Sequence, residues 1–297
     1  MNNVKPFQRF FQALVKLIGT HRGLRHIVHF ASILVPGMRR YNATLMDGSQ
    51  LVLDLREGMC CPILFHGFIP HEDAETKILK QLTRPGDIFV DVGANVGFYT
   101  AIARKWVGDS GMVIAFEPNF YCIELMKLSF SSDANVVVVP KALGSEKRTA
   151  KLYVPSLGNL ATVHIARFKP KYIFDVEVIR LDDYLRENSL PMPSIIKIDV
   201  EGNELSVIQG MEYLITGPDK PIMAFECIEE FHEEYNASLS EIINFIQSKS
   251  NNSYLFYRVD YDGKLREKDI HITSAQNDII AIPKKRKKEI EGNLLNA

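Results

Sequence analysis

GDIFVDVGANVGFYTAIARKWVGDSGMVIAFEP, residues 86–118, is the stretch of sequence that decides the fold. Residues 88–92 are short, apolar and rich in β-branched side chains, so they predict a strand, and glycines bracket the turn that follows. Apolar residues then recur at helical spacing, and the run MVIAF predicts a second strand that leads into Glu117. Strand, glycine-bearing turn, helix, strand and acid, in this order, are typical of a nucleoside-binding unit.

The turn DVGANVG favours one nucleoside over another. Asn95 stands where the dinucleotide pattern GxGxxG has its second glycine, and a side chain there argues against close approach to a pyrophosphate. Asp91 would repel phosphate, but it suits a ligand with a cationic amino group and a sulfonium. Glu117 can accept both hydroxyls of a ribose through charge-assisted hydrogen bonds. These features predict S-adenosylmethionine as cofactor; an ordinary strand-to-helix turn is the alternative.

Length and composition agree with a soluble enzyme. The chain has 297 residues, 46% of them hydrophobic, and 35 basic against 36 acidic residues, so the whole chain offers no electrostatic argument for a nucleic-acid partner. Four cysteines form neither a disulfide framework nor a zinc spacing, which suggests a reducing compartment. No apolar run reaches about 18 residues and no signal peptide is recognisable. We therefore expect a cytoplasmic protein.

The two ends of the chain are basic. Residues 1–40 hold seven lysines and arginines and no acid, and the apolar residues over 7–18 recur at helical spacing. They predict an amphipathic helix that either packs on the main domain or lies on the inner face of a membrane, or on a partner. The run KKRKK, residues 284–288, is expected to be a solvated tail, with anionic lipid or nucleic acid as alternative ligands.

Between these ends, strands and helices alternate, as a parallel sheet requires. An Asp47-Gly48 turn within residues 43–55 predicts a hairpin ahead of the main domain, and an Asp262-Gly263 turn predicts that the last two strands pair antiparallel. The expected fold is α/β, a seven-stranded, mostly parallel, doubly wound sheet of the Rossmann-like class I methyltransferase type. We expect three parts: an N-terminal helix and hairpin extension over 1–72, the methyltransferase domain over 73–283, and a basic C-terminal tail over 284–297.

Four segments resemble one family. DVGANVGFYT, AFEPN, LDDYL and IKIDVEGNELSVIQG follow one another as in the FkbM family of S-adenosylmethionine-dependent methyltransferases, over roughly residues 73–283. The resemblance implies O-methylation of a hydroxyl on a sugar, glycan, glycolipid or polyketide. It also implies the cofactor contacts: the loop residues Asp91, Gly93, Asn95 and Gly97, the ribose ligand Glu117, and Ala142 and Leu143 beside the adenine.

A second group of candidate residues follows the fourth strand. Lys197 and Asp199 alternate with isoleucines, so both project from one face, next to Glu201 at the carboxyl end of the sheet. Methyl transfer requires in-line alignment of the acceptor oxygen and a base for its proton. We expect Asp199 or Glu201 to be that base and Lys197 to orient the carboxylates or the acceptor. The alternative is a structural ion pair between Lys197 and Asp199.

Other polar residues receive simpler interpretations. Asp199 and Glu226 occupy places where some O-methyltransferases hold a divalent cation, but a third ligand is missing, so we expect no metal. Asp182 is interpreted as the N-cap of a short helix or as a site residue, and Glu75 as a residue on a helix surface. Solvated or core positions are expected for the histidines His66, His71, His164 and His232.

Acceptor binding is expected to involve the N-terminal segment and the loop over residues 144–171, whose neighbourhood contains the rings of Tyr153, His164, Phe168 and Tyr172. Two other classes of protein stay open. One is a protein that binds S-adenosylmethionine without catalysis, which the Lys197, Asp199 and Glu201 cluster argues against. The other is a nicotinamide-dependent oxidoreductase, which would need a glycine at Asn95.

Overall fold

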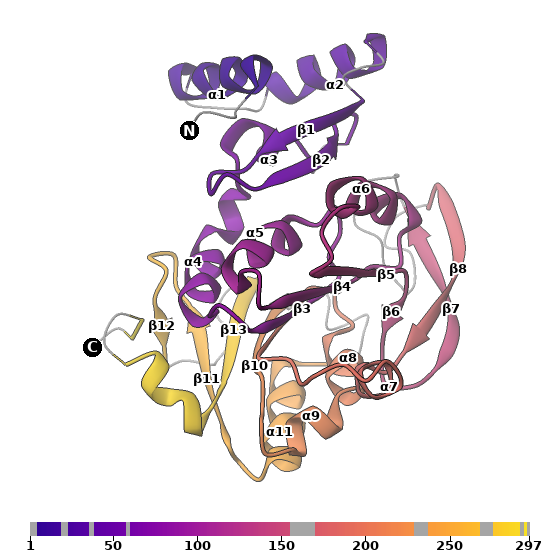
Figure 1. Ribbon diagram of the computed structural model, residues 1–297. Coiled ribbons are helices and arrows are strands. Elements are labelled where there is room, and N and C mark those ends of the chain that lie inside the picture. Colours follow the sequence, from indigo (N-terminus) through magenta and orange to yellow (C-terminus); the bar gives the residue numbers. More distant parts are fainter. Residues whose placement is uncertain are drawn as a thin grey trace.

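The computed structural model describes residues 5–18, 23–35, 39–57, 60–154, 170–228, 237–267, 276–291 and 294–295. Its centre is an eight-stranded sheet with helices on both faces (Figure 1). In spatial order the strands are β12 (Leu265–Arg266), β11 (Tyr254–Val259), β13 (Gln276–Pro283), β10 (Ile222–Ile228), β9 (Ile195–Ile198), β3 (Ile88–Val92), β4 (Met112–Phe116) and β5 (Val136–Val139). The strands from β10 to β5 run parallel, and β13, β11 and β12 pair antiparallel.

The predicted fold class is confirmed, with one strand more than expected. β11 and β13 pair antiparallel, as the turn signal indicated. The Asp262-Gly263 turn, however, joins β11 to the short extra strand β12 and not to β13. A tight two-residue turn links only strands that are next to each other in the chain, and β12 lies between β11 and β13 in sequence.

Alternating residues of the central strands enter two separate cores. In β3, Phe89 belongs to one hydrophobic cluster and Val90 to the other, because neighbouring side chains of a strand point to opposite faces. The first face is covered by α4 (Asp73–Leu82), α5 (Phe98–Val107) and part of α6 (Phe120–Phe130). The second face is covered by α7 (Leu181–Glu187), α8 (Glu204–Gln209), α9 (Glu212–Thr216) and α11 (Leu239–Ser250).

A separate three-stranded sheet lies beyond β5. It consists of β6 (Ala142–Leu143), β8 (Tyr172–Ile179) and β7 (Arg148–Val154), with β7 and β8 antiparallel. β8 is the middle strand of this sheet and pairs with both β6 and β7. Of the rings expected near the acceptor, Tyr153 and Tyr172 lie on this sheet, and His164 and Phe168 lie outside the described residues.

The N-terminal part forms a layer of its own at one end of the molecule (Figure 1). It contains α1 (Pro6–Ile18), α2 (Leu24–Leu34), the hairpin β1 (Arg40–Thr44) and β2 (Gln50–Asp54), α3 (Cys60–His66) and the 3-10 turn η2 (Pro70–Glu72). The predicted amphipathic helix and hairpin are both present. Within the described ranges, no helix combines the length and the apolar character needed to cross a bilayer.

The C-terminal basic run is not the solvated tail that we expected. Residues Lys284–Glu289 form the 3-10 helix η3 against the edge of the sheet. The guanidinium group of Arg286 donates to the carbonyl oxygen of Ser194 at 2.8 Å and pairs with Glu289. Ile290 and Leu294 are buried in the core. Apolar residues after the basic run therefore attach this segment to the domain.

Candidate active site

A cavity of about 400 Å³ opens at the carboxyl ends of β3, β4 and β9. β3 and β9 are neighbours, yet the chain continues from β3 to β4 on one side and from β9 to β10 on the other. Open parallel sheets bind ligands at such a switch in strand order. All predicted site residues except Gly97 line the cavity: Asp91, Gly93, Asn95, Glu117, Ala142, Leu143, Lys197, Asp199 and Glu201.

The turn after β3 requires glycine at two positions for different reasons. Gly93 has a φ of +80°, and a Cβ there would lie 1.8 Å from the carbonyl oxygen of Asp199. The backbones that follow β3 and β9 therefore touch at Gly93. Gly97 has a φ of +90°, and a Cβ there would meet Met126 and Phe130 of α6 at 2.9 and 3.0 Å. Gly97 thus packs the turn on α6 behind the cavity.

Glu117 presents a carboxyl group that two backbone donors hold in place. The N–H of Asn95 donates to Oε2 and the N–H of Asn119 to Oε1, each at 2.8 Å. The residue is 6% exposed, and burial raises the pKa of its carboxyl group to about 7 against the effect of these two bonds. Carboxylate oxygens keep further lone pairs after one bond each. The geometry therefore fits a ligand that offers two adjacent hydroxyls.

Asp91 lies deeper than Glu117, at the floor of the cavity. Its Oδ2 accepts a hydrogen bond of 2.6 Å from the Thr100 hydroxyl, and the residue is 1% exposed. Burial raises the pKa of this carboxyl group to about 6, and the nearby Lys197 opposes the rise. Asp91 and Glu117 together make the cofactor end of the cavity acidic, which suits a cationic ligand.

Lys197 and Asp199 project from the same face of β9, as their alternation in the sequence predicted, and they form the ion pair considered as the alternative. The Nζ of Lys197 lies 2.9 Å from Oδ2 of Asp199 and 4.4 Å from the centre of the Tyr99 ring. Burial alone would lower the pKa of Lys197, but Asp199, Glu75 and other carboxylates hold it well above its usual range. The side chain of Lys197 is 5% exposed and that of Asp199 is 29% exposed, so the pair presents its acid to the cavity.

Glu201 occupies an uncommon backbone position. Its φ is +55°, and the next residue, Gly202, has a φ of +99°. Non-glycine residues in this region carry a conformational cost and concentrate at functional sites. Burial, with Asp199 and Glu226 nearby, raises the pKa of the Glu201 carboxyl group to about 8. Glu201 is therefore poised to gain or lose a proton near neutral pH.

Sequence reasoning missed several acids on the far side of the cavity. Glu75 is not a surface residue: it is 5% exposed, lines the cavity and accepts a hydrogen bond of 2.7 Å from the Tyr99 hydroxyl. His71, Glu72 and Asp278 also line the cavity. Burial raises the pKa of both Glu72 and Asp278 to about 8. The one available signal was Glu72 and Glu75 three positions apart, which share a helix face.

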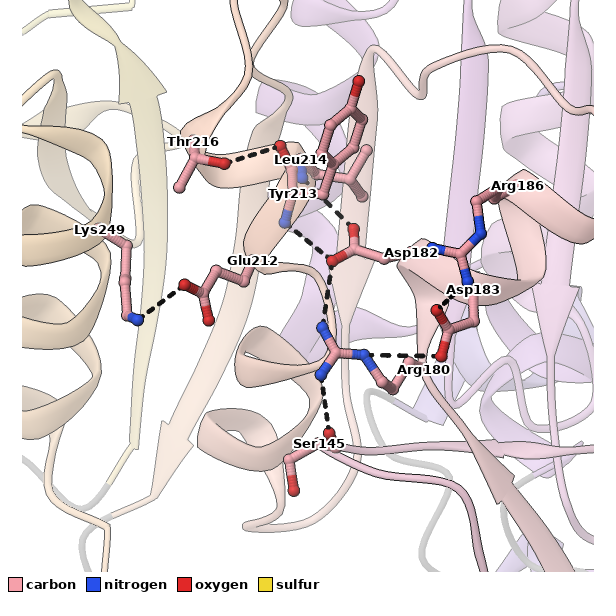
Figure 2. A network of polar contacts seen from close by, with 10 residues as sticks. All are labelled: Ser145, Arg180, Asp182, Asp183, Arg186, Glu212, Tyr213, Leu214, Thr216 and Lys249. Atoms are coloured by element: carbon pink, nitrogen blue, oxygen red, sulfur yellow. Dashed lines mark hydrogen bonds and ion pairs between the residues drawn. The ribbon is translucent and has the colours of Figure 1, made fainter.

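Asp182 plays a structural part that the sequence only half indicated. Figure 2 shows its carboxylate beneath the start of α9, where it accepts the N–H groups of Tyr213 at 2.8 Å and Leu214 at 3.3 Å. Arg180 braces the same carboxylate and donates to the carbonyl oxygen of Ser145. Asp182 therefore caps α9 and not its own helix, α7, and it does not line the cavity. The capping role is thus present, but on a different helix from the predicted one.

The remaining polar candidates are Glu226, which was considered as a metal ligand, and the histidines. Glu226 lines the cavity together with Asp199. Among the described residues, no group of three or more histidine, cysteine, aspartate or glutamate side chains is arranged to hold a metal ion. His66 packs against Phe68 with ring centres 5.7 Å apart. His164 and His232 lie outside the described residues.

The strand order and the site together define the class of protein. Read from β5, the order β5-β4-β3-β9-β10-β13-β11 with an antiparallel end is that of a class I methyltransferase, and a buried acid, Glu117, follows β4. The profile of the family described as Methyltransferase FkbM domain matches residues 91–256. The chain belongs to this family.

Two curated relatives are similar to part of the chain. Hexuronic acid methyltransferase AglP from Haloferax volcanii is 28% identical over 137 residues, which cover 46% of this chain and 54% of AglP. Methyltransferase sdnD from Sordaria araneosa is 30% identical over 156 residues, with 41% of this chain and 60% of sdnD covered. The chain thus spans less than two thirds of either relative.

Solved structures include a neighbour with the same family label. The crystal structure of methyltransferase FkbM from Methylobacillus flagellatus KT superposes with a TM-score of 0.45 and 16% identity. The superposition covers 76% of this chain and 55% of that chain.

Proposed function

We propose that this methyltransferase acts on a hydroxyl group of a sugar, glycan or glycolipid. The observation that carries the proposal is that one cavity contains both Glu117 and the cluster of Lys197, Asp199 and Glu201. A methyl donor held by Glu117 would lie next to groups able to orient and deprotonate an acceptor. The sugar class is supported by the name of AglP, which is a hexuronic acid methyltransferase.

The residues around the turn after β3 fit S-adenosylmethionine. Glu117 would hold the ribose hydroxyls, the Gly93–Asn95 backbone would face the rest of the ligand, and Ala142 and Leu143 offer buried apolar side chains for the adenine. The acidic floor at Asp91 complements the positive charge of the ligand. When bound, the cofactor supplies an electrophilic methyl group.

Glu117→Ala is expected to weaken S-adenosylmethionine binding by roughly 100-fold or more, because two charge-assisted hydrogen bonds are lost. Calorimetric titration of the purified chain with S-adenosylmethionine and, separately, with NAD measures this. Glu124→Ala is the matched control, since the Glu124 side chain is exposed on α6. Preference for NAD would support the oxidoreductase alternative, and unchanged binding by Glu117→Ala would refute the ribose assignment.

Of the two candidate bases, Glu201 is better placed than Asp199. One oxygen of Asp199 is engaged by the Lys197 ammonium group, which leaves only the other oxygen to accept the proton of an acceptor hydroxyl. The carboxyl group of Glu201 lines the cavity, and its raised pKa matches the neutral range in which a general base works best. We therefore assign Glu201 as the base and the Lys197–Asp199 pair as a group that positions the acceptor.

The acids on the far side of the cavity favour an acceptor without a carboxylate. Glu72, Glu75 and Asp278 add three acidic groups near Lys197, and the raised pKa of Glu72 and Asp278 shows that the cavity already disfavours further negative charge. The Oε2 atom of Glu72 is buried and has no hydrogen-bond partner among the described residues. A sugar hydroxyl could donate to this oxygen, whereas a carboxylate would be repelled by it.

Above pH 8, where Glu72 and Asp278 are ionised, a neutral glycoside is therefore expected to exceed the matching uronic acid as acceptor by roughly tenfold or more in kcat/KM, since one like charge in a partly buried site costs at least about 1.4 kcal/mol. Transfer of labelled methyl from S-adenosylmethionine to methyl glucoside and methyl glucuronoside measures the ratio. Glu72→Gln should bring this ratio of kcat/KM values closer to one, because the substitution removes the charge and retains an oxygen acceptor. A preference for the uronic acid would contradict this account of the cavity.

A further inference from the structure

The outer sides of α1 and α2 expose an unusual number of large apolar side chains. Among the described residues, more than half of all exposed large hydrophobics lie on these two helices and the residue that follows them. The most prominent are Phe10, Leu17, Ile27, Phe30, Ile33 and Leu34, which are 46–82% exposed. We call this set the N-terminal apolar face. Clustered exposure of this kind marks an interaction surface.

The N-terminal apolar face exists although both helices are firmly packed on their other sides. The amide group of Gln8 is buried and makes two hydrogen bonds of 2.9 Å with the backbone of Thr44. Phe11 and Val15 of α1 and Val28 of α2 are buried in the core. Figure 1 shows both helices on the outer side of the hairpin, farthest from the eight-stranded sheet. The exposed apolar residues therefore do not contribute to the core of the domain.

Positive charge surrounds the N-terminal apolar face. Residues 1–46 contain no aspartate or glutamate, in a chain with 36 acids. On α1, Phe10 and Leu17 share a helix face, and the basic residues Arg9 and Lys16 lie beside them at the same spacing. All the basic residues described in this region are exposed: Lys5, Arg9, Lys16, Arg25, Arg39 and Arg40.

We infer that the N-terminal apolar face docks this enzyme onto an anionic phospholipid bilayer. Apolar side chains flanked by lysine and arginine are the pattern of helices that lie in the membrane interface. α1 has 13 residues and α2 has 11, which is short of the roughly 20 needed to span. A second copy of the chain fits this surface poorly, because two such faces would bring like charges together.

The docking proposal goes beyond the proposed function and uses no residue of the cavity. Each basic side chain near an anionic surface strengthens partitioning by about fivefold, and each inserted phenylalanine or leucine by roughly tenfold or more. Several such residues act together here. Binding to vesicles can therefore be measured whether or not an acceptor for methyl transfer has been found.

Flotation of the full chain with vesicles tests the inference. We expect binding to phosphatidylcholine vesicles that contain roughly one third phosphatidylglycerol, and binding about tenfold or more weaker to phosphatidylcholine alone. Phe10→Ser with Phe30→Ser should reduce the first binding by roughly tenfold or more. Arg9→Gln with Lys16→Gln and Arg25→Gln should do the same through charge.

Two control variants separate this surface from general properties of the chain. Tyr261→Ser removes a fully exposed apolar ring at the β11–β12 turn, and Lys284→Gln with Lys285→Gln and Lys288→Gln removes three exposed charges from η3. Both should bind vesicles as the unmodified chain does. Equal binding to both vesicle types, loss of binding in the controls alone, or a dimer that the Phe10→Ser and Phe30→Ser changes dissociate would overturn the inference.

Discussion

Gly93→Ala is expected to abolish measurable S-adenosylmethionine binding and to lower the midpoint of thermal unfolding. The new Cβ would lie 1.8 Å from the carbonyl oxygen of Asp199, which is backbone and cannot rotate away. An L-residue at a φ of +80° adds about 1–2 kcal/mol of strain. The turn after β3 or the turn after β9 must therefore move, and both turns build the cavity. Calorimetric titration and thermal denaturation measure the two effects.

Gly263→Ala is the control for Gly93→Ala, because it introduces the backbone strain without a steric clash. Gly263 has a φ of +73°, but the nearest atom to a Cβ there is Cδ of Lys77 at 3.7 Å. This variant should lose about 1–2 kcal/mol of stability and keep its affinity for the cofactor. If Gly93→Ala binds S-adenosylmethionine as tightly as Gly263→Ala does, the contact between the two turns is unimportant for the site.

Glu201→Gln is expected to reduce kcat by about 10²- to 10⁴-fold while cofactor affinity stays within a few-fold, because glutamine fills the same space and cannot take a proton. The free enzyme should also show kcat/KM rising with pH and levelling above a pKa of about 8. Burial favours the protonated acid, so at lower pH a smaller fraction of Glu201 is in the carboxylate form that acts as the base. The Glu201→Gln profile should be flat in this range.

Asp199→Asn provides the comparison for this assignment. It should reduce kcat by misplacing Lys197 and the acceptor, yet the residual activity should keep the rise with pH. Single-turnover rates across pH for the two variants distinguish the roles. A flat profile in Asp199→Asn with a retained rise in Glu201→Gln would identify Asp199 as the base.

Most of the sheet could be predicted because its signals are local. β3 and β4 are short runs of β-branched and apolar residues, and their observed bounds agree with the predicted ones. The positions of Gly93 and Glu117 could also be predicted, since they directly follow β3 and β4, and their contacts with the cofactor stay a prediction. The packing role of Gly97 could not be predicted, because its partners on α6 are distant in the sequence.

Errors arose where a charged residue finds its partner far along the chain. Glu75 has the spacing of a helix-surface residue, but Tyr99 and Lys197 enclose it from other elements. Asp182 sits in the first turn of a helix, but the N–H groups that it accepts belong to residues 31 and 32 positions later. A helical pattern shows which face a side chain occupies and not what packs against that face.

The sequence by itself determined the α/β class, the turn after β3, the acid that follows β4 and the placement of Lys197 and Asp199 on one face of their strand, because each depends on residues within one strand-turn-helix unit. The tertiary structure alone decided that Glu72, Glu75 and Asp278 join these groups in one acidic cavity, and that one side of α1 and α2 stays exposed. Both outcomes depend on contacts between elements distant in the chain, and on the burial that raises the pKa of the acids, which no local pattern encodes.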